Sequence, residues 1–248
     1  MPSTALDPVG VAGRRAAWDT VMTGFVPGLP ALERVIGTVT EGLHGGPPTR
    51  VLDLGGGPGL LAERMAARWP GARVGLVDID PVLLALARTA LPGAVDVIDA
   101  DLTAPAWTAA AGGGYDLVTA VMTVHYLDPA PIRTLYRAIR RVLAPGGLLV
   151  VADLMPDDHA PTVMRALDPV PGEATAELAW TQWWGELTAA AEFAPLLAAR
   201  SEVFRDRPTA EFAGGPAWHA QAARAAGFAE SGLLWRDGRH AALACRRT

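Results

Sequence analysis

The sequence of 248 residues contains no lysine and no asparagine, so all 21 of its basic side chains are arginines. Without lysine, neither a Schiff base nor a lysine general base can form. The single cysteine, Cys245, excludes an internal disulfide and a cysteine-based metal site. The sequence also lacks an apolar run of about 18 residues, the length that crosses a membrane. The N-terminus lacks the basic-then-apolar order of a signal peptide, and we therefore expect a cytoplasmic location.

The charge balance counts against nucleic acid as a partner. A formal net charge of −5 provides no overall attraction for a polyanion, although a local basic patch stays open, so we expect no nucleic-acid partner. Without a long apolar run, we also expect no membrane partner. Half of the residues are apolar, which suffices for one sizeable α/β domain. The abundance of Ala, Gly, Pro and Arg is typical of a GC-rich bacterial genome. A homodimer remains open.

The middle of the chain alternates strand and helix signals. Short apolar runs predict strands at 50–55, 72–80, 94–100, 115–124 and 148–154. Segments with helical spacing lie between them, at 60–69, 81–91 and 131–143. This alternation predicts a mostly parallel sheet wrapped by helices, with ligands at the carboxyl ends of the strands.

The last part of the chain predicts a different connection. After a helix at 216–228, an Asp-Gly pair separates the apolar runs Leu233–Trp235 and Ala241–Cys245. Asp-Gly between two such runs is a strong signal for a hairpin. The predicted fold is therefore α/β and Rossmann-like: a doubly wound, mostly parallel sheet of seven strands that ends in an antiparallel C-terminal hairpin.

Two regions lie outside this alternation, and we predict that both form a helical lid. Residues 1–49 precede the first strand as an N-terminal lid segment, and 155–208 is an insertion with no convincing strand. Within the insertion, residues 177–197 read as helical and carry Trp180, Trp183 and Trp184. We therefore divide the chain into the 1–49 segment, a ligand-binding core of 50–154 with 209–248, and a substrate-binding insertion of 155–208.

The stretch "VLDLGGGPG" (51–59) places a carboxylate inside an apolar run and then a glycine-rich turn. Because the glycines follow a strand and precede a helix, their amides can face a ligand at the positive helix N-terminus. The order is Asp53-x-Gly55-x-Gly57-x-Gly59, not G-x-G-x-x-G. The turn predicts a nucleoside or dinucleotide site, although a tight strand–helix turn without a ligand has the same composition.

Further carboxylates close the second and third strands. Asp78, followed by Ile79, is placed to accept both ribose hydroxyls of an adenosine that lies across the sheet. Asp101 and the amide of Leu102 could meet the adenine edge. Each aspartate alone could be a solvated helix cap. Carboxylates on three consecutive strand ends favour a nucleoside.

In order and spacing, "VLDLGGGPG", "VGLVDID", "DADL", "YDLVTAVMTVHYL" and "LAPGGLLVVADL" resemble the class I S-adenosylmethionine-dependent methyltransferases of small-molecule type. The resemblance covers 50–154 well, and the C-terminal helix and hairpin also fit it. It implies S-adenosylmethionine as cofactor and S-adenosylhomocysteine as product. It further implies the following cofactor-binding residues: Asp53, Gly55, Gly56 and Gly57 under the methionine part, Asp78 and Ile79 at the ribose, Asp101 and Leu102 at adenine, and the backbone of Ala120 and Val121 at the methionine ammonium.

Methyl transfer is an in-line displacement whose leaving group needs no proton, so the protein supplies alignment, desolvation and sometimes a base. His125, just past the fourth strand, is the best candidate for a catalytic base, because an imidazole titrates near neutral pH. A histidine that only packs near the cofactor would occupy the same place.

The acceptor is predicted by elimination to be a small organic molecule. The family's segment for amino-group methylation is absent after the fourth strand, Cys245 is remote from the methyl, and a lysine-based ribose methylase is impossible. An Asp-Asp-Asn metal set is impossible without asparagine, and "DDH" (157–159) reads as a solvated loop, so we expect no metal. We expect methylation at O, N or C in bacterial natural-product metabolism.

Aromatic side chains of the two lid regions are predicted to contact the acceptor, because their faces exclude water and tolerate the sulfonium charge. They are Trp18, Phe25, Trp180, Trp183 and Trp184. The alternative is that they form only the buried face of a lid helix.

Two other enzyme classes remain open from the sequence. A carboxy-S-adenosylmethionine synthase would need an arginine over the modified methyl, for which Arg200, Arg205 and Arg207 are available. An NAD-dependent oxidoreductase is disfavoured by Asp53, the glycine spacing and the terminal hairpin. A binding module that keeps the fold without catalysis is the remaining alternative.

Overall fold

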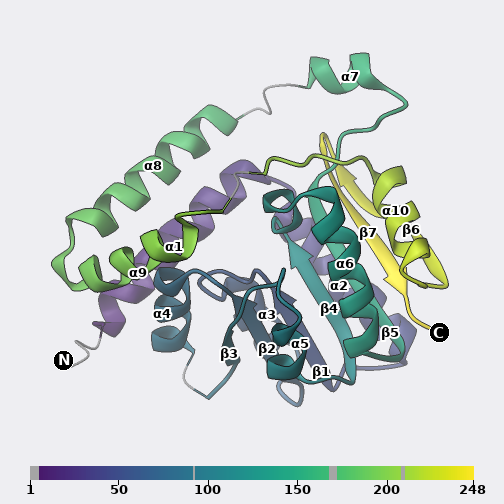
Figure 1. The fold of residues 1–248 in the computed structure, drawn as a ribbon, viewed down its shortest axis with the longest axis horizontal. Coiled ribbons are helices and arrows are strands. Elements are labelled where there is room, and N and C mark those ends of the chain that lie inside the picture. The colour runs from purple at the N-terminus through teal and green to yellow at the C-terminus, as the bar shows by residue number, and fades with distance from the viewer. Residues whose placement is uncertain (1–5, 92, 168–171, 208–209) are drawn as a thin grey trace.

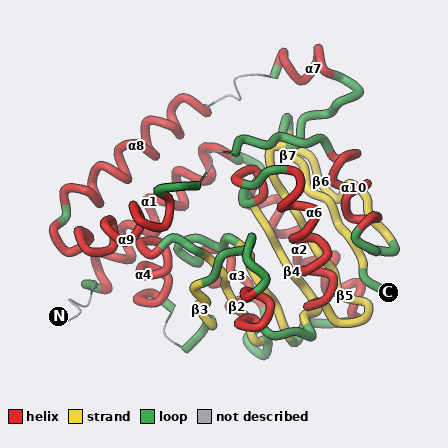
Figure 2. The backbone as a smooth tube through the Cα atoms, in the orientation of Figure 1, coloured by secondary structure: helices red, strands yellow, loops and turns green. Residues whose placement is uncertain are grey.

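The computed structural model describes residues 6–91, 93–167, 172–207 and 210–248 (Figures 1 and 2). Its centre is a seven-stranded sheet with the order β3-β2-β1-β4-β5-β7-β6. All neighbours pair in parallel except β5–β7 and β6–β7, which are antiparallel. The strands are β1 (Arg50–Leu54), β2 (Arg73–Asp78), β3 (Asp96–Asp99), β4 (Tyr115–Val121), β5 (Leu143–Leu154), β6 (Glu230–Asp237) and β7 (His240–Arg246). The predicted fold class is confirmed.

The helices include the three predicted between the strands and the one before the hairpin. They are α1 (Pro8–Phe25), α2 (Leu29–His44), α3 (Leu60–Arg68), α4 (Pro81–Ala90), α5 (Ala106–Ala111), α6 (Pro129–Val142), α7 (Pro161–Ala166), α8 (Glu173–Ala189), α9 (Ala194–Phe204) and α10 (Pro216–Ala225). Pro81 opens α4 as predicted, and the Asp80 carboxylate caps the helix by accepting from Val82 N. None of the helices in the described ranges is both long and apolar enough to cross a bilayer.

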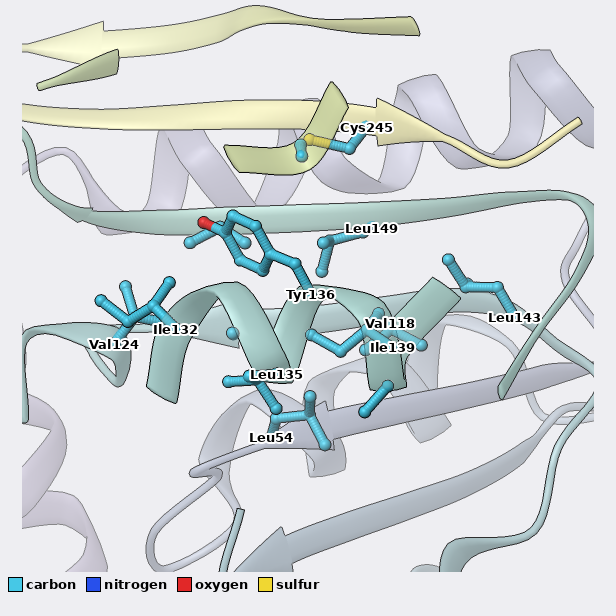
Figure 3. Close-up of a cluster of buried hydrophobic side chains, with 14 of the residues drawn as sticks. Leu54, Val118, Val124, Ile132, Leu135, Tyr136, Ile139, Leu143, Leu149 and Cys245 are labelled. Atoms are coloured by element: carbon cyan, nitrogen blue, oxygen red, sulfur yellow. The ribbon is translucent and has the colours of Figure 1, made fainter. Parts of the chain in front are cut away.

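Helices cover both faces of the sheet. One face packs on α5, α6 and α10, and Figure 3 shows Tyr136 and Ile139 of α6 among Val118, Leu149 and Cys245 of the sheet. The other face packs on α2 and α3, with Leu32 and Ile36 of α2 fully buried. Burial on both faces explains why β1, β4 and β5 are near-continuous apolar runs.

The structure differs from the sequence prediction at several boundaries. β5 begins at Leu143 and not at 148, because Leu143 already pairs with Tyr115 of β4. The register then shifts across "APGG" before Leu148 pairs with Leu117. The hairpin strands are longer than predicted, while Gly238 takes the left-handed conformation that the turn requires (φ 54°). The predicted helix over 177–197 breaks at Ala190, whose extended backbone separates α8 from a 3-10 turn, η2 (Ala191–Phe193), and α9.

Residues 172–207, here called the α8–α9 segment, lie against α1 and α4 (Figure 1). A third apolar cluster joins them. Trp183, Leu187 and Phe193 of the segment contact Val82 and Leu86 of α4. The indole N–H of Trp183 donates to the carbonyl of Arg14 in α1 (2.9 Å). The segment therefore covers the β2–β3 side of the carboxyl edge of the sheet.

Candidate functional site

The glycine turn between β1 and α3 is shaped by hydrogen bonds to β2. The amides of Gly55 and Gly56 donate to the carbonyl of Val77 (2.7 and 3.3 Å), and the amide of Gly57 donates to the Asp78 carboxylate (2.8 Å). Gly55 and Gly57 have left-handed φ values of 65° and 55°. A Cβ on Gly55 would overlap the Thr123 side chain, so glycine is required there for both reasons.

Asp53 lies beneath this turn and is 2% exposed. Its Oδ1 accepts from the Thr119 hydroxyl (2.8 Å), whereas Oδ2 is buried without a hydrogen-bond partner and faces Gly56. Desolvation, opposed by the Thr119 hydrogen bond and reinforced by the charge of Asp78, raises the pKa of Asp53 to about 7. The carboxyl is thus a buried acid without a compensating cation in contact.

Asp78, at the end of β2, organises the same edge. Besides the Gly57 amide, it accepts from its own neighbours, the amides of Ile79 (2.7 Å) and Asp80 (2.9 Å). Burial raises the pKa of Asp78, although these three N–H donors act in the opposite direction. Asp78 therefore joins the glycine turn to the start of α4, in the position that the sequence predicts for a ribose-binding carboxylate.

Asp101, just beyond β3, is engaged on both oxygens. Oδ1 accepts from the amide and hydroxyl of Thr103 (2.8 and 2.7 Å), and Oδ2 accepts from Arg207 (2.5 Å). Burial acts against these donors, yet they hold the pKa of Asp101 below its ordinary value. Leu102, the next residue, packs against the α5–α6 side of the core.

The end of β4 has an unusual backbone. Ala120 is buried and Val121 half-buried, and Met122 then has a φ of 53°, the one left-handed non-glycine conformation among the described residues. The Thr123 hydroxyl donates to the carbonyl of Leu54 (3.0 Å), which joins this bend to the glycine turn. The place predicted for the methionine part of the cofactor therefore lies where the ends of β1 and β4 meet, beside a constrained backbone.

His125 lies in the 3-10 turn η1 (Val124–Tyr126) after β4, and its ring is positioned by Asp153 at the end of β5. Nδ1 of His125 is 2.8 Å from Asp153 Oδ1. Because a carboxylate can only accept, Nδ1 carries the proton and Nε2 is the acceptor nitrogen. Asp153 is 2% exposed and also accepts from the amides of Thr123, Val124 and His125 (3.1, 2.9 and 3.2 Å). The histidine therefore has the tautomer of a general base.

The predicted aromatic residues gather into one cluster between α1 and α8. Trp18 lies 5.0 Å from Trp180 and 4.8 Å from Trp183 between ring centroids, and Phe25 lies 6.4 Å from Trp180. Trp184 contacts both neighbouring tryptophans of α8. A Cβ on Gly57 would be 3.7 Å from Trp18, so the cluster stands over the glycine turn. Trp183 is buried, whereas the other four are half-buried.

Two candidate functional residues are not predicted from the sequence. One is Asp153, whose only signal is a carboxylate inside the apolar run of β5, as Asp53 is in β1. The other is Arg15 of α1, which is buried and donates to the carbonyl of Pro58 (2.8 Å) and to Glu63 (2.9 Å). Arg15 thereby fastens α1 to the glycine turn, and no local pattern marks it.

The remaining side chains limit the chemistry of the site. In the part of the chain that the structure describes, no group of three or more His, Cys, Asp or Glu side chains could hold a metal ion. Cys245 is buried in β7, and desolvation raises its pKa to about 12, so the thiol is not a nucleophile at neutral pH.

Residues 51–147 match the family model described as a methyltransferase domain. A trans-aconitate 2-methyltransferase from Azoarcus sp. (strain BH72) is 38% identical over 148 residues, which cover 60% of this chain and 55% of that one. A ubiquinone biosynthesis O-methyltransferase from Xanthomonas oryzae pv. oryzae is 39% identical over 107 residues, 42% of this chain and 43% of that one. The chain thus spans about half the length of the curated relatives it matches.

Among solved structures, an O-methyltransferase family protein from Burkholderia thailandensis has a TM-score of 0.61 at 20% identity, with 94% of this chain and 60% of that chain covered. An amino pentose methyltransferase from Micromonospora echinaspora, involved in calicheamicin biosynthesis and solved with S-adenosylmethionine bound, has a TM-score of 0.57 at 21% identity, with 88% and 91% covered. At these identities the likeness concerns the fold alone.

Proposed function

This chain belongs to the class I S-adenosylmethionine-dependent methyltransferases, and we propose that it transfers the methyl group of S-adenosylmethionine to a small organic acceptor. The observation that carries the proposal is the glycine turn held on Asp78, with the His125–Asp153 pair on the adjoining strand ends. The turn supplies a cradle and the pair supplies a base, and they face the same edge of the sheet.

The residues at this edge fit the cofactor. The amides of Gly55, Gly56 and Gly57 are held by Val77 and Asp78, so they do not face a ligand as the sequence predicts. The absence of side chains in this turn still lets a ligand approach the main chain, and Asp78 is a carboxylate at the predicted ribose position. The buried Oδ2 of Asp53 and the backbone at Ala120 and Val121 suit a cation such as the methionine ammonium. When bound, S-adenosylmethionine would supply an electrophilic methyl carbon on a positively charged sulfur.

The role of the chain at the acceptor is to orient it and to remove a proton. His125 Nε2 accepts the proton of an acceptor hydroxyl, while Asp153 holds the ring and stabilises the imidazolium that forms. A base of this kind favours an acceptor that loses a proton on methylation, such as a phenol or enol, over a carboxylate. Asp78, Asp101 and Ile79 contact the nucleoside instead.

The aromatic cluster would exclude water from this edge. Trp18, Phe25, Trp180 and Trp184 are only half-buried, and their faces could border both the cofactor and a planar acceptor. Trp183 serves the packing of α8 on α1. We accordingly keep 1–49 and 155–208 as the lid regions, of which 1–5, 168–171 and 208 lie outside the described residues.

We further propose a role in bacterial natural-product metabolism. The predicted small-molecule acceptor and the GC-rich bacterial composition of the sequence support this assignment, and the methyltransferase of calicheamicin biosynthesis shows that the same fold occurs in such metabolism. The curated relatives are named for trans-aconitate and ubiquinone instead. The proposed catalytic pair favours a hydroxyl acceptor like that implied by the O-methyltransferase name.

The carboxy-S-adenosylmethionine synthase alternative loses its support. Arg200 is paired with Asp80 (2.5 Å), Arg207 with Asp101, and Arg205 with Glu202, so all three candidate arginines are engaged by carboxylates. The pairs of Arg200 and Arg207 lie beyond β2 and β3, on the predicted nucleoside side.

The test is a binding and transfer experiment with the whole chain. Calorimetry should show saturable 1:1 binding of S-adenosylhomocysteine and no binding of NADH. Incubation with methyl-labelled S-adenosylmethionine and matched acceptors should label phenols and enols more than their carboxylic counterparts. Failure to bind S-adenosylhomocysteine would refute the cofactor assignment, and preferential labelling of carboxylates would refute the role of the base.

A further inference from the structure

Two arginines of the α8–α9 segment reach aspartates that follow neighbouring strands. Arg200 of α9 pairs with Asp80 after β2, and Arg207, three residues beyond α9, pairs with Asp101 after β3 (both 2.5 Å). Figure 1 shows α9 beside α4 on the β3 side of the molecule. The segment therefore lays two guanidinium groups along the predicted nucleoside end of the site.

Arg200 has a structural role. Its partner Asp80 is buried and caps α4, and its guanidinium stacks on Trp184 (4.1 Å) and Phe204 (4.8 Å). The guanidinium of Arg200 is thus in contact with one carboxylate and two aromatic rings of the protein. This pair accounts for the attachment of α9 to α4.

Arg207 differs from Arg200 in its partner, which is accessible to a ligand. The two arginine side chains are almost equally exposed (33% and 34%), but the side chain of Asp101 is 26% exposed and that of Asp80 only 5%. Asp101 Oδ1 is engaged by Thr103, whereas Oδ2 accepts one donor from Arg207 and retains a second lone pair. Nε of Arg207 donates to the carbonyl of Val203, which orients the planar guanidinium.

We propose that Arg207 is a specificity-determining residue that reads the purine edge of the cofactor together with Asp101. This rests on the proposed function, which gives the site its nucleoside. A carboxylate can only accept, so Asp101 matches the exocyclic amine of adenine. A guanidinium can only donate, so Arg207 matches an acceptor on the ring, or the 6-oxo group of hypoxanthine. The pair therefore weakens the discrimination that Asp101 would exercise alone.

The test measures the affinities of S-adenosylhomocysteine and S-inosylhomocysteine by calorimetry for the wild type and Arg207→Met. Loss of the donor should weaken the binding of S-adenosylhomocysteine about 10-fold and that of S-inosylhomocysteine about 100-fold. These losses are in the range expected for charge-assisted hydrogen bonds. The preference for adenine then rises about 10-fold. Arg205→Met is the matched control, because Arg205 pairs with the exposed Glu202 of its own turn.

Asp101→Asn should change the ratio in the opposite direction, because an amide can donate to the 6-oxo group. Circular dichroism checks that each variant folds. An equal loss for both ligands would mean that Arg207 only holds the α8–α9 segment, and unchanged or tighter binding would also overturn the proposal. If the wild type binds neither ligand, the proposed function fails instead.

Discussion

Replacement of Asp53 by asparagine should stabilise the protein at neutral pH while weakening its site. The carboxyl is fully buried, its Oδ1 holds the Thr119 hydroxyl, and its Oδ2 has no partner. An asparagine retains the Thr119 hydrogen bond and carries no charge. It leaves two buried N–H groups unpaired where the protonated carboxyl leaves one O–H, which costs the variant a pH-independent amount of about 1–3 kcal/mol.

The magnitude follows from the pKa of Asp53, which is raised from 3.8 to about 7. The folded state then holds a proton that the unfolded state releases between these pH values. Stability from Asp53 is therefore present below pH 3.8 and is lost as the pH rises to about 7. A shift of about 3 pKa units corresponds to about 4 kcal/mol at 1.36 kcal/mol per unit. The stability of Asp53→Asn relative to the wild type should therefore rise by about 4 kcal/mol between pH 4 and pH 8.

The measurement is urea unfolding, followed by tryptophan fluorescence, at several pH values between 4 and 8. Asp99→Asn is the control, because it removes the same charge from an exposed position of β3. Its difference from the wild type should not depend on pH in this way. A pH-independent difference for Asp53→Asn would refute the argument that an uncompensated buried charge lies beneath the glycine turn. Weaker S-adenosylhomocysteine binding by the more stable variant would show that the destabilising acid serves the site.

Three further changes test two residues of the site and one buried histidine of the core. Asp78→Ala should weaken the binding of S-adenosylhomocysteine by about 2–4 kcal/mol in calorimetry, because the variant loses the charge-assisted hydrogen bonds to the ribose and releases the Gly57 amide. Unchanged affinity would contradict the ribose assignment. His125→Ala should lower turnover by about 10²–10⁴-fold with S-adenosylhomocysteine affinity retained, because it removes the proposed base; equal turnover of wild type and variant would remove His125 from the chemistry. His219, buried against Tyr136, has a pKa lowered from 6.5 to about 4 by desolvation, so wild-type stability should fall between these pH values as the pH drops. His219→Gln should gain about 3 kcal/mol on the wild type between pH 7 and 4 in urea unfolding, and an unchanged difference would show that the buried ring titrates normally.

The sequence by itself determined the sheet, the glycine turn and the order of the carboxylates at its edge. These features rest on short-range signals. Apolar runs mark strands buried on both faces, Pro81 marks a helix start, and Asp237-Gly238 marks the hairpin turn. Asp78 was predictable as a site residue because the carboxyl ends of parallel strands meet at one edge.

Tertiary structure alone decided how these residues are engaged. His125 and Asp153 are 28 positions apart, and Asp101 and Arg207 are 106 apart, so no local pattern pairs them. The raised pKa of Asp53 likewise depends on burial under the Gly56 backbone, which sequence spacing does not express. Periodicity reports which face of an element is apolar, but the partner of a polar side chain depends on where distant elements pack. Sequence could therefore predict the edge that carries the site, whereas the hydrogen bonds that give each residue its chemistry required the folded chain.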